Sequence, residues 1–154
     1  MLFKKSFKKK FEPVLRKITE HKLFEDCVLE SKDLKTFIHY FAYSSASLSD
    51  YLRKKIGVDE CLYPVELFVD EVKGVDKTGG FSLTLRFTEE RYEEVGLGLI
   101  SADFERKYKD LITFNQWDRD KSINLSMQNV SEANFERALN MFLDEAYTIM
   151  ESLN

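Results

Sequence analysis

The sequence predicts an α+β fold, in which N-terminal helices precede an antiparallel sheet of about five strands and a long C-terminal helix packs on that sheet. Residues 81–87 (FSLTLRF) alternate strictly between apolar and polar side chains, the pattern of a strand that is covered on one face only. Residues 131–152 carry apolar side chains three and four positions apart, the pattern of an amphipathic helix. Strands joined by short turns and followed by a long helix favour a sheet with helices packed against it.

The chain begins with a basic segment, MLFKKSFKKKF, whose apolar residues recur at helical spacing. Pro13 interrupts the pattern, because a proline inside a helix removes a hydrogen bond and clashes with the preceding turn. We therefore expect residues 2–11 to form a separate turn or a kinked segment, and a firmer helix to run from Pro13 to about Lys22. On this interpretation residues 1–12 are a detachable basic amphipathic segment. The apolar positions are Phe3, Phe7, Phe11, Val14, Leu15 and Ile18.

Three roles are open for this basic segment: a core-packing helix with a solvated lysine face, a helix on a membrane surface, or an arm that binds nucleic acid. Residues 1–22 contain eight Lys and Arg against two Glu, giving +6, whereas the remaining 132 residues contain 15 against 25 Asp and Glu, giving −10. An acidic body repels phosphate backbones, so specific nucleic-acid binding is not expected and a basic partner suits the chain better.

Two further helices are predicted at residues 31–45 (SKDLKTFIHYFAYSS) and 47–56 (SLSDYLRKKI), each begun by a serine or aspartate that can cap it. Gly57 should end the second helix, because glycine readily adopts the left-handed conformation found after helix C-termini.

The strands follow in two hairpins. Residues 63–73 (YPVELFVDEVK) precede the glycine-rich loop GVDKTGG, so they should pair antiparallel with 81–87. Residues 112–117 (ITFNQW) and 122–128 (SINLSMQ) flank DRDK, which suggests a second hairpin. Residues 95–101 (VGLGLIS) are expected to supply a middle strand.

Helices complete the pattern. Residues 102–109 (ADFERKYK) are expected to form a short helix between the two hairpins. Asn129 and Glu132 stand at capping-box spacing before the terminal helix, which should run from about 131 to 152 and cover the sheet.

A chain of 154 residues with 44% hydrophobic and 32% charged residues is most simply one domain, residues 1–154, with one core. No apolar run approaches the ~20 residues of a membrane span, and the lysine-rich start is not followed by the apolar stretch of a secretory signal, so we expect a cytoplasmic protein. Cys27 and Cys61 form no CxxC motif and are interpreted as free thiols. No residue pattern suggests a cofactor.

One short element has an enzymatic resemblance. Glu71-Val72-Lys73, after an apolar strand, resembles the ExK element of PD-(D/E)xK nucleases, in which a carboxylate holds Mg²⁺ and a lysine assists the attacking water. The resemblance covers about ten residues (VELFVDEVKG), and only Asp59 lies nearby as a second metal-binding carboxylate. His21 and His39 have no partner at metal-ligand spacing. We therefore predict no catalytic and no metal-binding residues, and keep a Mg²⁺-dependent nuclease as the alternative.

The acidic surface is the better candidate for a binding site. TEERYEEVG contains four glutamates within six residues, the densest acidic patch of the chain, and opposed charge speeds association with a basic partner. Aromatic side chains near the patch could anchor that partner. The predicted partner-binding residues are Glu89, Glu90, Tyr92, Glu93, Glu94, Trp117, Asp118 and Asp120.

The favoured hypothesis is a non-enzymatic protein that neutralises or escorts a basic protein partner, a toxin or an effector, as immunity proteins and secretion chaperones do. From the first strand onward, the predicted order of elements resembles that of type III secretion chaperones, which pair as dimers through their sheets and helices; the resemblance implies that a homodimer is an alternative. A membrane-surface adaptor that uses the first helix is the remaining hypothesis.

Overall fold

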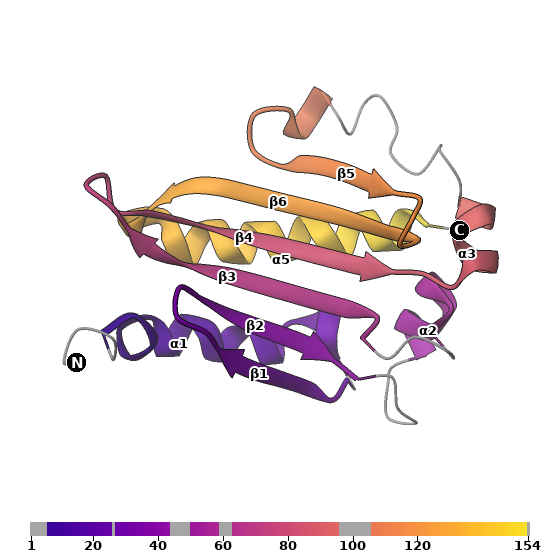
Figure 1. Ribbon diagram of the computed structural model, residues 1–154, viewed down its shortest axis with the longest axis horizontal. Helices are drawn as coiled ribbons and strands as arrows, with labels where there is room; N and C mark the ends of the chain where they lie inside the picture. Colours follow the sequence, from indigo (N-terminus) through magenta and orange to yellow (C-terminus); the bar gives the residue numbers. More distant parts are fainter. Residues whose placement is uncertain (1–5, 26, 44–49, 59–62, 96–105, 154) are drawn as a thin grey trace.

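The computed structural model describes residues 6–25, 27–43, 50–58, 63–95 and 106–153. Within them the chain forms an α+β fold with one six-stranded antiparallel sheet (Figure 1). The helical elements are α1 (Ser6–Glu20), η1 (Lys22–Phe24), α2 (Asp50–Ile56), α3 (Glu89–Val95), η3 (Glu132–Asn134) and α5 (Phe135–Ser152). The strands are β1 (Leu29–Asp33), β2 (Phe37–Ala42), β3 (Val65–Lys73), β4 (Thr78–Arg86), β5 (Thr113–Trp117) and β6 (Ser122–Ser131).

The strands lie in the order β1-β2-β3-β4-β6-β5, so β6 pairs with β4 and leaves β5 at the edge. Helices α1 and α5 lie side by side across one face of the sheet, while α2 and α3 lie at the end where β4 finishes (Figure 1). No described helix covers the opposite face. That face is called the open face below.

The core lies between the sheet and the two long helices. Alternate residues of the four inner strands point into it and are buried, and α5 contributes a stripe at helical spacing. Phe81 of β4 is its centre, because its ring lies 4.9 Å from that of Phe135 and 5.6 Å from that of Phe142, all three fully buried. The predicted terminal helix and its packing on the sheet are confirmed.

Residues 31–45 do not form the predicted helix; residues 29–42 form the β1–β2 hairpin. A tight turn joins the strands, in which the Leu34 amide donates to the Phe37 carbonyl at 2.8 Å. Ile38, Tyr40 and Ala42 are buried on the core face. The helix prediction was wrong because β2 is apolar on both faces, so it lacks the polar alternation that identifies a strand.

Helix α1 runs from Ser6 to Glu20 through Pro13, so residues 6–11 do not form the separate turn that was one of the two expectations; a kink at Pro13 stays a prediction. Val14, Leu15 and Ile18 are buried in the core, and this packing holds the helix together although Pro13 donates no hydrogen bond. Helix α1 therefore packs on the body from Val14 onward, and the expectation that residues 1–12 are detachable stays a prediction. Phe3 and the side chains of Phe7 and Phe11 lie outside the described residues.

Both predicted hairpins are confirmed, as β3–β4 and β5–β6. The predicted strand at 95–101 falls on Val95, the last residue of α3, and on residues outside the described ranges. Of the predicted helix at 102–109, residues 106–108 are helical and residues 102–105 lie outside the description.

The predicted capping box at Asn129 is wrong, because Asn129 lies within β6 and the terminal helix begins at Phe135. Asn129 has φ +60°, and with Gln128 it stands opposite the single residue Gly80 of β4. This is a β-bulge, in which one residue takes a left-handed conformation that asparagine tolerates better than most.

The end of α5 is fastened to α2. Lys55 Nζ donates to the carbonyl of Glu151 at 3.1 Å and to that of Leu153, so a cation occupies the negative end of the helix dipole. Helix α2 then ends at Gly57 with φ +63°, as predicted, and a Cβ there would meet Thr88 Oγ1 at 2.7 Å. The segment 50–58 therefore links α5 to the start of α3.

We expect the stability to fall in alkaline solution and Tyr40 to account for part of the fall. Burial, with a smaller contribution from the Asp33 carboxylate, raises the pKa of Tyr40 to about 12 from 10.0. Since the folded pKa is above the unfolded one, this contribution is complete below pH 10 and is lost as pH rises toward 12, at about 1.4 kcal/mol per pH unit. Denaturant unfolding of wild type and Tyr40→Phe across this range should give a flatter pH profile for the variant. Equal slopes would contradict the assignment.

Candidate functional site

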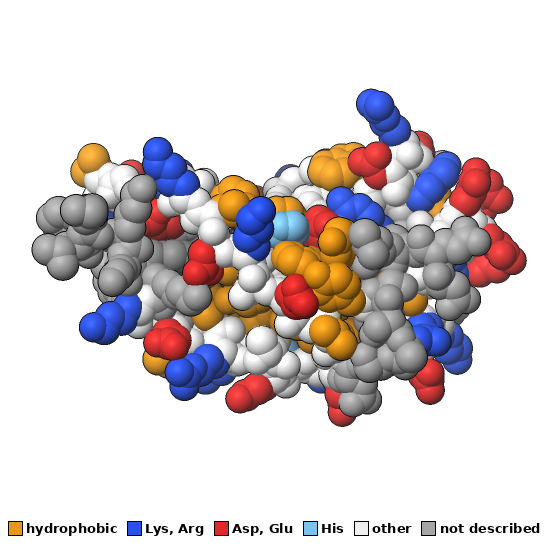
Figure 2. Space-filling view, turned by 60° about the horizontal axis from the view of Figure 1, so that its bottom comes forward, with side chains coloured by type: hydrophobic (Ala, Val, Ile, Leu, Met, Phe, Trp, Pro, Cys, Tyr) orange, Lys and Arg blue, Asp and Glu red, His pale blue; other side chains and the backbone are white. Residues whose placement is uncertain are grey.

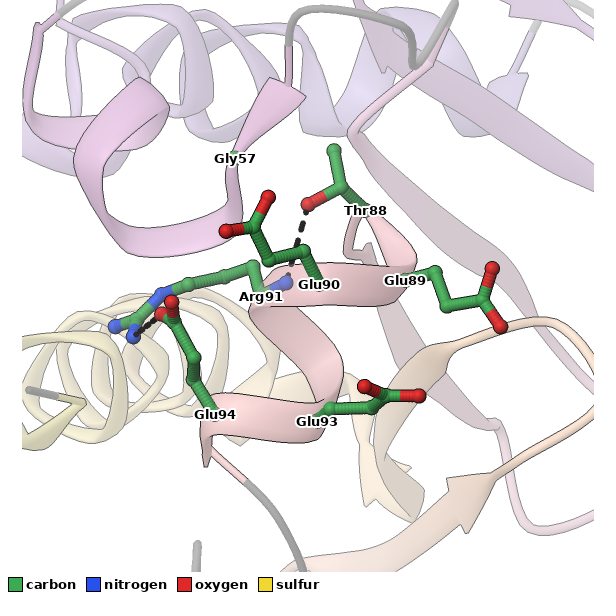
Figure 3. A pocket seen from close by; sticks show the side chains of 7 residues that line it. All are labelled: Gly57, Thr88, Glu89, Glu90, Arg91, Glu93 and Glu94. Atoms are coloured by element: carbon green, nitrogen blue, oxygen red, sulfur yellow. Dashed lines mark hydrogen bonds and ion pairs between the residues drawn. The ribbon is translucent and has the colours of Figure 1, made fainter.

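Helix α3 presents the acidic cluster that sequence analysis selected. Glu89 and Glu93 point to one side of the helix, and Glu90 and Glu94 point to the other (Figure 3). All four side chains are exposed. Thr88 stands before the first turn, where its Oγ1 accepts a hydrogen bond from the Arg91 amide at 3.3 Å, as an N-cap residue does.

Arg91 points toward α2 and holds α3 against it. Its Nε donates to the Lys55 carbonyl at 2.9 Å, and its guanidinium pairs with Glu94 at 3.0 Å. The Arg91 side chain is mostly buried. Its ion pair with Glu94 neutralises one of the four glutamates of α3 within the chain. Among the described residues, no ion pair involves Glu89, Glu90 or Glu93, and the remaining negative charge of α3 rests on these three.

Tyr92 faces inward from α3 and is buried rather than exposed as an anchor. Its hydroxyl donates to Asp118 Oδ1 at 2.6 Å, and Lys121 Nζ lies 5.2 Å from the centre of its ring. Burial, and then the bond to Asp118, raises the pKa of Tyr92. The structure thus joins α3 to the β5–β6 turn, bringing together predicted site residues that are 26 positions apart.

Trp117 and Asp120 lie beside this junction. Trp117 ends β5 opposite Ser122, and 45% of its surface is exposed. Asp120 is exposed in the turn. Beside α3 itself lies an open hollow of about 700 Å³ (Figure 3). It is lined by Gly57, Thr88, Glu89, Glu90, Arg91, Glu93 and Glu94.

The open face of the sheet carries a second surface, which sequence analysis missed. Six half-buried rings from β2, β3 and their flanks are in contact, with neighbouring ring centres 4.3–5.6 Å apart. We call them the aromatic row: Phe37, His39, Phe41, Tyr43, Tyr63 and Phe68. Val28 beside Tyr43 and Leu34 beside Phe37 extend it, and they are 42% and 39% exposed.

Figure 2 shows hydrophobic side chains gathered near the middle of the molecule, seen with the β1 edge turned forward. Acidic side chains gather at the right-hand end of the view, where Figure 1 places α3. The aromatic row runs toward that same end of the sheet, because β2 and β4 both finish there and β3 begins there.

Charged and polar residues occupy the rest of the open face. Glu66 is nearly buried beside Phe41, and its carboxylate lies 3.0 Å from Arg86 Nη1 and 3.7 Å from His39 Nε2. Toward β6 the face becomes uncharged, as Asn124 Nδ2 donates to the hydroxyl oxygens of Ser82 and Thr84 at 3.0 and 2.9 Å. The open face therefore changes from aromatic to polar across the sheet.

The sequence contains one signal for the strand positions of the aromatic row, the residue composition of β2. Apart from Ala42, FIHYFAY consists of aromatic and β-branched residues that favour strands, and apart from His39 no charged or strongly polar residue marks either of its two faces. A strand of this composition places apolar side chains on both faces of the sheet. Because residues 31–45 were interpreted as a helix, the apolar surface on the second face was not predicted.

The Glu71-Val72-Lys73 element lies at the end of β3, where Glu71 and Val72 form a bulge opposite Gly79. A hairpin to β4 follows directly, and Lys73 is exposed. Asp59 lies outside the described residues. Within the described ranges, no group of three or more His, Cys, Asp or Glu side chains could hold a metal ion.

The two histidines occupy different settings. His21 Nδ1 accepts from the Leu23 amide at 3.1 Å and Nε2 lies 2.7 Å from Asp144, so His21 caps η1 and ties it to α5. His39 stacks on Phe68 with ring centres 4.3 Å apart. The Cys27 thiol donates to the Glu25 carbonyl at 3.6 Å, and Cys61 lies outside the described residues.

No family model, no curated protein and no solved structure matches this chain. None of the described helices is long and apolar enough to cross a membrane.

Proposed function

We propose that this protein is a non-enzymatic binding protein that neutralises or escorts a basic protein partner, as immunity proteins and secretion chaperones do. The observation that carries the proposal is the state of α3. Glu89, Glu90 and Glu93 are exposed, and none of them pairs with a cation of the described chain. Positive charge on a partner would accelerate its association with α3, and its basic side chains could form ion pairs with these three glutamates.

The rigidity of the acidic helix supports the same proposal. Arg91 is bonded to α2 and Tyr92 to the β5–β6 turn, so the glutamates project from a helix that is fixed on two sides. A fixed array loses little conformational freedom when a partner binds. Trp117, exposed next to the Tyr92–Asp118 contact, offers an aromatic anchor beside the charges.

Replacing Glu89, Glu90 and Glu93 together with glutamine should abolish capture of the partner. Tagged wild type and variant would be incubated with extract of the native host, and the captured proteins would be identified by mass spectrometry. With the captured protein purified, surface plasmon resonance should show association at least about tenfold slower for the variant. Raising the salt to physiological strength should also slow association to wild type, since the Debye length is then ~8 Å.

A matched control removes three exposed carboxylates elsewhere: Glu20→Gln, Asp76→Asn and Asp110→Asn. It has the same net charge as the α3 variant and should keep the wild-type association rate. If the α3 variant captured the same proteins at the wild-type rate, the acidic helix would not belong to the interface.

A further inference from the structure

We propose that the aromatic row on the open face binds an apolar segment of the partner that carries arginine or lysine side chains. This rests on the proposed function and adds a second contact surface to it. The row is apolar and lies on a face that no described helix covers, whereas every other large group of apolar residues in the described chain belongs to the core. A contiguous apolar surface of this kind is typical of an interaction site.

The shape of the row favours a segment that lies along the strand. From Phe37 to Tyr43 it follows β2 for about 20 Å, at ~3.3 Å per residue. Val28 and Leu34 extend it along the neighbouring strand at its two ends. An extended or helical segment of the partner can therefore place several apolar side chains against it at once.

The charges around the row indicate a basic segment. Tyr43 donates to Glu30 at 3.0 Å, which fixes a carboxylate beside the ring, and Asp70 stands opposite Phe37 at the other end. Of the basic groups on this face, Arg86 is held by Glu66, and Lys32 stands opposite His39 at the middle of the row, so the carboxylates of Glu30 and Asp70 lie toward its two ends. Ring faces also attract guanidinium and ammonium groups, so aromatic rings next to carboxylates suit arginine and lysine.

Helix α3 completes this complementarity. The row ends at Tyr43 and Tyr63, at the same end of the sheet as the glutamates of α3. A segment that lies on the row and continues past this end extends toward the end of the molecule where acidic side chains gather (Figure 2). The same charges disfavour a nucleic acid, although stacked rings on a sheet can bind unpaired bases.

A defined probe tests the inference without the natural partner. The probe is a short fluorescein-labelled peptide of alternating leucine and arginine, and its binding is followed by fluorescence anisotropy at physiological salt. Companion peptides replace leucine with serine or arginine with glutamate, and a labelled oligothymidine represents a single-stranded nucleic acid. Wild type should bind the leucine–arginine peptide at least about tenfold more tightly than each of the other three.

The decisive variant is Phe41→Ser with Phe68→Ser, which removes two rings of the row. It should weaken binding of the leucine–arginine peptide at least about tenfold, whereas the control Val75→Ser with Leu111→Ser, which removes exposed apolar side chains elsewhere, should not. A second measurement needs no variant: the peptide should shift the amide NMR signals of β2 in wild type. Both results together would support the inference.

Three results would overturn the inference: wild-type affinity in the row variant, undisturbed β2 amide signals, or tighter binding of oligothymidine than of the peptide. Peptide binding that is lost only in the α3 variant would also overturn it, while leaving the proposed function in place. The proposed function is tested separately, in the capture experiment with host extract, where capture by the α3 variant at the wild-type rate would contradict it.

Discussion

Replacing Phe142 with alanine should destabilise the protein by about 3–5 kcal/mol, because it removes a ring from the centre of the core. Phe142 is fully buried on α5 and packs on Phe81, which also contacts Phe135. A folded domain is stable by about 5–15 kcal/mol, so the variant should retain only part of its stability and melt about 10 °C lower or more. Thermal and urea unfolding, followed by circular dichroism, measure the change.

Phe142→Leu is the matched control for this experiment. Leucine fills most of the space and should cost less than about 1.5 kcal/mol, since volume matters more than the ring itself. If Phe142→Ala melted close to wild type, α5 would not be packed on the sheet through this cluster.

Replacing Gly80 with alanine should cost about 3 kcal/mol, because the added methyl group has no space. A Cβ at Gly80 would lie 2.5 Å from the backbone oxygen of Met127, opposite the β6 bulge. Strands β4 and β6 would have to separate, since a backbone oxygen that belongs to a strand cannot turn aside as a side chain can. Urea unfolding of the purified variant gives the loss.

Gly74→Ala separates this effect from backbone strain. Gly74 has φ +83° but no atom within 4 Å of its Cβ position, so alanine there suffers only the left-handed conformation, about 1–2 kcal/mol. Equal losses for the two variants would show that the contact between β4 and β6 is looser than described.

The parts of the fold that could be predicted from sequence are those with one buried face. Phe81, Leu83 and Leu85 alternate with polar residues, and the strand they predict is present; the stripe of α5 is equally clear. The β1–β2 hairpin could not be predicted in this way, because Phe37, His39 and Phe41 occupy the second face of β2 with aromatic rings. An apolar run of this kind fits a strand and a buried helix equally well.

Local signals also failed where a distant contact outweighs them. Pro13 normally ends a helix, yet α1 continues because Val14 and Ile18 are held in the core. Asn129 matches a helix cap in sequence, yet its position is fixed by the pairing of β6 with β4. The conformations at Pro13 and Asn129 both depend on contacts with residues distant in the sequence, and the residues next to them in the sequence do not indicate these contacts.

The candidate site shows the same limit. The glutamates of α3 are visible in composition, because four of them stand within six residues. The inward orientation of the Tyr92 side chain is not visible in the composition, since it depends on the hydrogen bond to Asp118. The aromatic row cannot be recognised without knowing that Phe68 of β3 stacks on His39 of β2. Charge clusters can be read along the chain, whereas surfaces assembled across strands cannot.

The place of β6 in the sheet has a consequence for synthesis on the ribosome. Strand β4 is translated before β6, which pairs with its second edge, and the first residue of β6, Ser122, follows Arg86 only after a further 35 residues. Until β6 and α5 have been translated, the nascent sheet therefore exposes an unpaired edge and the apolar faces of Phe81, Leu83 and Leu85. The strand and the helix that cover this part of the core are therefore translated last, and an incomplete chain that lacks them is prone to aggregate.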